Sequence, residues 1–167
     1  AYYAANPLAV LRFWDGGLVF LGGLIGGTAA AITYIQYKKL PLWEMADLAA
    51  ILIPVAYGMG RVGCFLAGCC LGNRTDTVFG VIFPGYLYPR HPTQLYSVAL
   101  ALLLFIFALW FRKRRQFSGQ SFVFYLAGYG IGRSLIELLR ENPTVFGNVT
   151  VAQFTGMMMI AAAIVLY

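Results

Sequence analysis

The chain has 167 residues, of which 60% are hydrophobic, 16% aromatic and only 11% charged. Its mean hydropathy is +0.74. Soluble domains carry roughly 25% charged residues, so these proportions exclude an ordinary soluble globular domain. The many Phe, Tyr, Leu and Ile residues also exclude a disordered chain. We therefore predict an all-α fold, a polytopic membrane protein with about five transmembrane helices.

The net charge of +6 comes from 12 Lys and Arg against 6 Asp and Glu. In a soluble domain this balance would indicate nucleic acid as a partner. In a membrane protein it indicates topology, so we expect a lipid bilayer and no nucleic acid. Six of the 12 basic residues form the clusters Lys38-Lys39 and Arg112-Lys113-Arg114-Arg115, and each cluster ends an apolar run. The positive-inside rule places both clusters at the cytoplasmic face.

Hydropathy predicts a single transmembrane domain over residues 1–167. The expected spans are 17–37, 43–60, 92–111, 117–139 and 150–167. Residues 61–92 hold all three Cys and the only His, and we predict that they form a structured loop at the outer face. The sequence has no signal peptide pattern. Residue 1 is not Met and the last apolar run reaches Tyr167, so we expect the sequence to be cropped.

A short internal repeat brings two arginines to similar positions. Tyr57-Gly58-Met59-Gly60-Arg61 matches Tyr129-Gly130-Ile131-Gly132-Arg133. Each copy ends a predicted inside-to-outside span, so both arginines are expected at similar depth near the outer leaflet. A charge in a span costs roughly 2.5–3.5 kcal/mol. We expect Arg61 and Arg133 either to bind an anion such as a phospholipid phosphate, or to snorkel or pair with an acid.

Glu137 is the acidic residue whose spacing allows it to pair with one of these arginines. Arg133, Glu137 and Arg140 are spaced i, i+4, i+7 and share one helix face. One carboxylate can neutralise and orient only one guanidinium. At least one arginine therefore remains for an anion.

The segment from Arg90 to Tyr96 precedes a clean span. His91, Gln94 and Tyr96 are its candidate binding residues, and His91 is the one side chain with an ordinary pKa near 6.5. The alternative is a helix start, with Pro92 near the first helical position and the neighbouring polar groups as caps.

The three cysteines, Cys64, Cys69 and Cys70, leave several roles open. They can be small buried residues, a local disulfide with one odd thiol, or a metal or redox site. Zinc sites usually have four ligands at tighter spacing, so we predict no metal and no cofactor. Asp47, near the start of its span, can cap a helix or pair with an arginine.

Four motifs together resemble those of prolipoprotein diacylglyceryl transferases, in the family order and over most of the chain. They are Phe13-Trp14-Asp15-Gly16-Gly17-Leu18, Gly60-Arg61-Val62-Gly63-Cys64-Phe65, His91-Pro92-Thr93-Gln94-Leu95-Tyr96, and Tyr129-Gly130 with Arg133, Glu137 and Arg140.

The resemblance implies a seven-span enzyme of the bacterial inner membrane whose active face is toward the periplasm. Such an enzyme moves a diacylglyceryl group from phosphatidylglycerol to the lipobox cysteine of a preprolipoprotein signal peptide. The product is a thioether, and glycerol phosphate is released. By the resemblance, Arg61 holds the headgroup, Arg133 is essential for catalysis, and Tyr129 and Glu137 support it. The implied substrate-binding residues are Arg61, Gly63, His91, Gln94, Tyr96, Arg140 and Asp47.

Three substitutions depart from the family pattern. Leu21 stands where the family has His, Cys64 where it has Asn, and Cys69 where it has Glu, and the first two family spans are absent. Leu21 and Cys69 favour a second hypothesis, a non-catalytic or re-targeted relative that binds phospholipid without transferring it to lipobox cysteines. A third hypothesis, a small transporter or channel subunit, rests on the repeat and the intramembrane charges.

Overall fold

The computed structural model describes residues 20–140, 144–146 and 149–167. The chain divides into two compact units, Ala1–Leu42 and Trp43–Tyr167. The first unit contains helix α2 (Phe20–Tyr37), which ends where the first predicted span ends. The predicted motif over residues 13–18 lies outside the described residues. The single domain over residues 1–167 stays a prediction.

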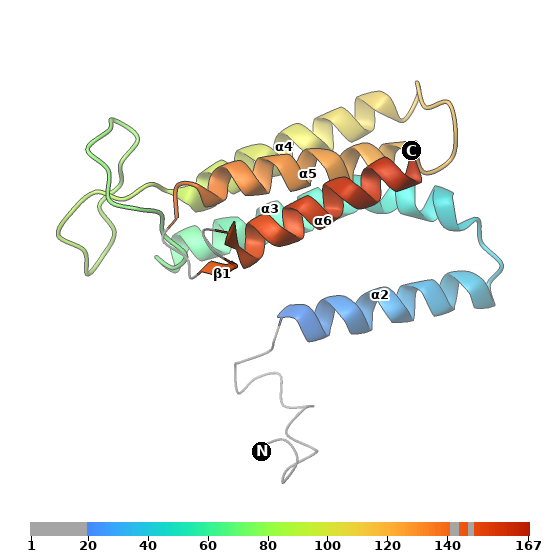
Figure 1. Cartoon of the computed structure of the whole chain (residues 1–167), viewed down its shortest axis with the longest axis horizontal. Coiled ribbons are helices and arrows are strands. Elements are labelled where there is room, and N and C mark those ends of the chain that lie inside the picture. Colours follow the sequence, from blue (N-terminus) through green and yellow to red (C-terminus); the bar gives the residue numbers. More distant parts are fainter. Residues whose placement is uncertain (1–19, 141–143, 147–148) are drawn as a thin grey trace, which may run out of the picture. The chain divides into compact units, whose positions relative to one another are not determined.

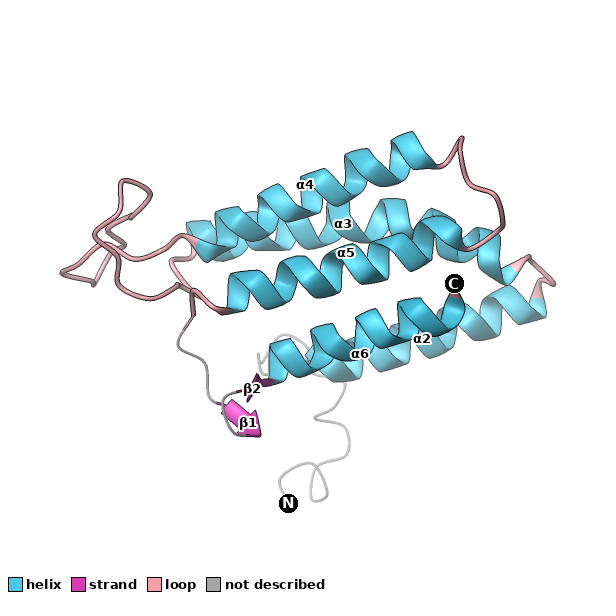
Figure 2. Cartoon of the chain, turned by 45° about the horizontal axis from the view of Figure 1, so that its top comes forward, coloured by secondary structure: helices cyan, strands magenta, loops and turns pink. Residues whose placement is uncertain are grey.

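Four helices build the second unit, with α5 between α4 and α6 (Figure 1). They are α3 (Leu42–Leu66), α4 (Thr93–Phe111), α5 (Gln120–Glu137) and α6 (Val151–Leu166). A short antiparallel pair of strands, β1 (Thr144–Phe146) and β2 (Val149–Thr150), precedes α6 (Figure 2). Within the described residues, α3 and α4 are both long and apolar enough to cross a membrane. The prediction of a helical membrane protein is confirmed.

Helix α3 continues further than hydropathy predicts. The predicted span ended at residue 60, but the helix runs through Arg61 to Leu66. The Arg61 guanidinium lies 5.0 Å from the centroid of the Tyr57 ring, and this cation–π contact lowers the cost of a charge in the helix. Pro54 is buried inside the same helix, where its missing N–H removes one hydrogen bond to the preceding turn.

The predicted outer-face loop therefore occupies residues 67–92. In both overall views it projects from the end of the bundle where α3 finishes and α4 begins. Two isolated bridges join Arg90 to Arg74 and to Val81. The Arg74 guanidinium lies 3.7 Å from the centroid of the Tyr88 ring, and Phe83 is buried. Contacts within the loop thus hold it in a defined conformation.

At the opposite end of the bundle, the buried Asp47 carboxylate joins α3 to the start of α5. It accepts hydrogen bonds from Arg115 Nη1 at 2.5 Å, from the Gly119 N–H at 2.8 Å and from the Phe122 N–H at 3.1 Å. Helix N-termini leave such N–H groups without partners inside the helix. Asp47 therefore caps α5 from another helix and neutralises one basic residue.

This contact sets the register of two helices that run in the same direction. Asp47 and Gly119 are 72 residues apart, and so are Tyr57 and Tyr129. The ten residues from Asp47 to Tyr57, and the ten from Gly119 to Tyr129, each correspond to a helical rise of about 15 Å. At that height the Tyr57 and Tyr129 rings meet edge to face, with centroids 5.4 Å apart. Equal numbers of helical residues therefore separate the Asp47–Gly119 contact from Tyr57 and from Tyr129, and this places the two copies of the repeat side by side.

Replacing Asp47 with Ala removes the acceptor of all three bonds. We expect the variant to lose about 2–4 kcal/mol of unfolding free energy, because each hydrogen bond to a charged group contributes about 1.5–3 kcal/mol and buried N–H groups lose their partner. Chemical denaturation of the detergent-solubilised protein measures the loss. Glu44→Ala, an exposed acid in the first turn of α3, is the control and should change stability by less than about 0.5 kcal/mol. Equal stability of the two variants would contradict the assignment.

Candidate functional site

Arg61 and Arg133 lie at matched depth, each one turn beyond a tyrosine of the facing pair. Fourteen residues separate Arg61 from Asp47, and the same number separate Arg133 from Gly119, a rise of about 21 Å on each helix. The structure thus places the two arginines toward the end of the bundle that carries the 67–92 loop. This arrangement agrees with the depth that the repeat predicts.

Arg133 is held by an ion pair within α5. Its Nη1 lies 2.6 Å from Glu137 Oε2, and the two side chains are 13% and 1% exposed. The buried carboxylate fixes the guanidinium on the helix face and leaves its other N–H groups to further acceptors. The spacing left open whether Glu137 would pair with Arg133 or with Arg140, and the structure shows the pair with Arg133.

Arg61 has a different environment. Its guanidinium lies over the Tyr57 ring, and Arg61 precedes Cys64 by three residues on α3. Among the described residues it forms no ion pair with a carboxylate. Its charge is therefore available to an anion.

A third guanidinium follows the end of α5. The Arg140 backbone N–H donates to the Glu137 carbonyl at 3.0 Å. Its Nε is buried and has no hydrogen-bond partner in the part of the chain that the structure describes. A buried donor without a partner costs free energy, so Arg140 is poised to donate to a further acceptor.

Tyrosine rings form the wall between the arginines and the bundle core. Tyr129 contacts Tyr57 edge to face, and it stacks on Tyr125 with centroids 5.9 Å apart. Tyr125 is buried. Neither Tyr57 nor Tyr125 was among the predicted site residues, although the repeat itself singled out Tyr57.

The His91–Tyr96 segment mainly fastens the loop to α4. The His91 backbone bonds to Gly72 and Asn73 at 2.9 and 3.0 Å, and its Nδ1 lies 3.1 Å from the Tyr96 hydroxyl. Gln94 is fully buried and donates to the Cys69 carbonyl at 2.5 Å. Helix α4 starts at Thr93, directly after Pro92, so the segment has the geometry of the helix-start alternative.

The three cysteines come together beside Arg61. Their sulfur atoms lie within 4.8 Å of one another, and all three are free thiols. Cys69 is exposed, and hydrogen bonding with Cys70, followed by desolvation, raises the pKa of its thiol to about 11 in the metal-free chain. Cys69 is therefore a neutral thiol at pH 7 and adds no negative charge near the arginine.

Two predicted binding residues need separate comment. Asp47 lies about 21 Å along α3 from Arg61, and its carboxylate already accepts three hydrogen bonds. The sequence grouped it with the binding residues, and the structure instead gives it a structural role at the other end. Gly63 is exposed on α3, and a Cβ built there would meet nothing within 4 Å, so a ligand can approach its backbone.

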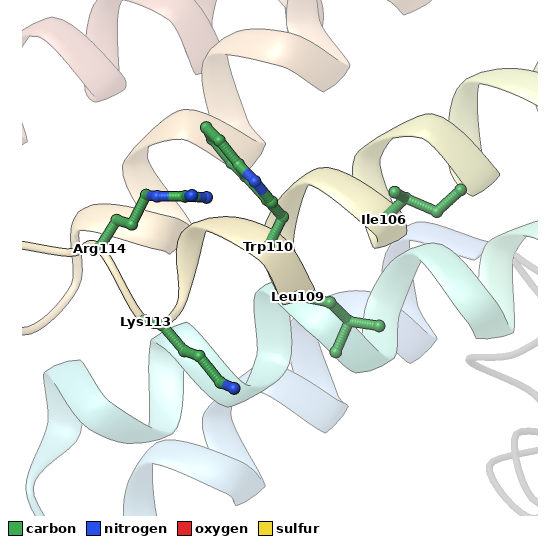
Figure 3. A pocket seen from close by; sticks show the side chains of 5 residues that line it. All are labelled: Ile106, Leu109, Trp110, Lys113 and Arg114. Atoms are coloured by element: carbon green, nitrogen blue, oxygen red, sulfur yellow. The ribbon is translucent and has the colours of Figure 1, made fainter.

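A shallow groove lies at the opposite, basic end of α4. Figure 3 shows the side chains that line it, Ile106, Leu109, Trp110, Lys113 and Arg114. The Arg114 guanidinium lies 3.9 Å from the centroid of the Trp110 ring. These five residues offer two cations and an indole but no acid, which fits an interfacial anchor rather than a reacting site.

Comparisons with known proteins agree with the motifs. The family model described as prolipoprotein diacylglyceryl transferase matches residues 1–167. A phosphatidylglycerol–prolipoprotein diacylglyceryl transferase of Bordetella parapertussis is 36% identical over 100% of this chain and 66% of its own length. The corresponding protein of Pasteurella multocida is 38% identical over 99% and 64%, and that of Clostridium tetani is 36% identical over 97% and 67%. The chain thus spans about two thirds of the length of these relatives.

Gly72 offers a test of the loop attachment. It is buried, and a Cβ added there would lie 2.7 Å from the Leu139 carbonyl oxygen and 2.8 Å from His91 Cβ. We expect Gly72→Ala to lower the unfolding free energy by about 1–3 kcal/mol, the usual cost of overpacking. Gly63→Ala is the matched control, because its added methyl group enters open space within a helix and should not destabilise the protein. Denaturation that leaves the two variants equally stable would overturn the packing assignment.

Proposed function

Because this chain belongs to the prolipoprotein diacylglyceryl transferase family, we propose that it transfers a diacylglyceryl group from phosphatidylglycerol to the lipobox cysteine of a preprolipoprotein. The observation that carries the proposal is the matched depth of Arg61 and Arg133 on two parallel helices. We place the protein in the bacterial inner membrane, with these arginines toward the periplasm. The cluster Arg112–Arg115 at the opposite end of the bundle supports that orientation.

The reaction requires substitution at an sp3 carbon of glycerol. The acceptor sulfur forms a C–S bond, while the bond from the same carbon to the phosphate oxygen breaks. The electron pair of that bond leaves with glycerol phosphate, which also takes up the thiol proton, directly or through His91. Guanidinium groups aimed at the departing phosphate stabilise the charge that develops there, and they favour the thiolate form of the acceptor.

Each arginine has its own role in this scheme. Arg61, which has no carboxylate partner among the described residues, holds the phosphate of the bound lipid. Arg133 is oriented by Glu137 and stabilises the leaving group, with Tyr129 packed behind it. Arg140 adds a further donor. Gly63 lets the headgroup approach the backbone of α3.

A phospholipid-binding relative without transferase activity is the second candidate function. It is favoured by Leu21, Cys64 and Cys69, which replace polar residues of the family pattern. The same phosphate site would then bind phosphatidylglycerol without presenting it to an acceptor thiol. The two functions differ in one measurable result: transfer increases the mass of an acceptor peptide by one diacylglyceryl group, and binding alone leaves that mass unchanged.

Incubating the purified protein with phosphatidylglycerol and a lipobox peptide tests the proposal. We expect the peptide to gain the mass of one diacylglyceryl group. Arg61→Lys and Arg133→Lys should each lower the initial rate by about 100-fold or more, because Lys keeps the charge but lacks the two-toothed fork and a lost transition-state donor costs about that much. Mass spectrometry of the peptide gives the rate.

Arg112→Lys serves as the matched control, because Arg112 is exposed at the basic end and should keep full activity. Full activity of both site variants would rule out the phosphate-binding role. Lipid binding without any peptide modification would favour the second candidate.

A further inference from the structure

The three thiols form the densest group of potential metal ligands among the described residues. Cys64 lies in the last turn of α3, and Cys69 and Cys70 lie in the loop that follows. Their sulfur atoms are all within 4.8 Å of one another. The proposed transfer reaction uses none of them, so their convergence needs its own account.

The backbone around the cysteines is fixed from the α4 side. The Cys69 carbonyl accepts from Gln94 Nε2 at 2.5 Å, and the Cys70 carbonyl accepts from Thr93 Oγ1 at 3.0 Å. Gln94 and Thr93 are both buried. Cys70 itself has φ of 62°, a left-handed conformation that costs a non-glycine residue roughly 1–2 kcal/mol. This strained turn is held by two partly buried hydrogen bonds, and it brings the two adjacent thiols within 4.8 Å of the Cys64 sulfur.

Although the sequence predicted no metal, the convergence of the sulfur atoms changes that expectation, and we propose that Cys64, Cys69 and Cys70 bind one zinc ion through three thiolates. Each thiol releases its proton to water as the metal binds. Tetrahedral zinc with Zn–S bonds of about 2.3 Å separates its sulfur ligands by roughly 3.8 Å. Sulfur atoms within 4.8 Å of one another need to shift by only about 1 Å to reach that geometry. The fourth position stays open to water or to an external ligand, as in zinc sites with three protein ligands.

Charge complementarity supports the assignment. Three thiolates and one Zn²⁺ together carry a net charge of −1, which needs a counter-ion in a membrane protein. Arg61 lies three residues before Cys64 on α3, and it forms no ion pair with a carboxylate among the described residues. It is therefore placed to balance the filled site. Soft thiolate ligands also select zinc over hard cations such as Mg²⁺.

Metal titration of the reduced, detergent-solubilised full chain tests the proposal independently of transferase activity. Competition with a chromophoric chelator should give one Zn²⁺ per chain. Co²⁺ in the same site should give a thiolate-to-metal charge-transfer band and the intense visible bands of tetrahedral cobalt. Cys64→Ser and Cys69→Ser should each weaken Zn²⁺ binding by about 100-fold or more, since even outer-shell changes cost 10–100-fold.

Asp76→Asn is the control, because it removes an exposed carboxylate of the same loop and should leave the affinity unchanged. A reduced wild-type chain that binds no Zn²⁺, or that gives no charge-transfer band with Co²⁺, would overturn the proposal even if a variant fails to fold. So would zinc binding that survives both Ser substitutions. If two of the thiols form a disulfide during purification, and the chain still binds no Zn²⁺ after that disulfide has been reduced, this result would also count against the site.

Discussion

The structure of the second unit depends on one buried carboxylate. Asp47 is almost fully buried, yet a charge in that position is tolerated because Arg115 and two backbone N–H groups of the α5 start surround it. These partners come from the loop and the helix that follow α4. A single side chain thus fixes the axial position of α5 relative to α3. The residues further along both helices are aligned as a result.

The positions of the helices were predictable because hydropathy reports the length of apolar runs directly. Helices α4 and α6 begin and end within one residue of the predicted spans, and α5 lies inside its span. The end of α3 was predicted too early. A hydropathy profile treats Arg61 as the start of a polar loop, since it takes no account of the Tyr57 ring that accommodates the charge within the helix.

The site was predictable in part. Spacing along one helix was enough to place Glu137 on one face with Arg133 and Arg140, because residues three or four apart share a face, but it did not indicate which arginine forms the pair. Contacts between helices depend on register and rotation, which a single sequence does not specify. For this reason the sequence did not decide whether Asp47 caps a helix or forms an ion pair. In the structure it does both, because it accepts hydrogen bonds from Arg115 and from two backbone N–H groups at the start of α5. The same limit hid the convergence of the three thiols, which depends on a left-handed turn at Cys70.

The equal spacing from Asp47 to Arg61 and from Gly119 to Arg133 restricts how this protein can tolerate insertions. One extra residue in a helix adds about 1.5 Å and rotates all later side chains by about 100°. An insertion in α3 alone would therefore turn Arg61 away from the face that Arg133 shares, while α5 kept its old orientation. The segments between each anchor and its arginine are thus constrained to change length together, and a chain altered in only one of them would retain its helices but lose their alignment.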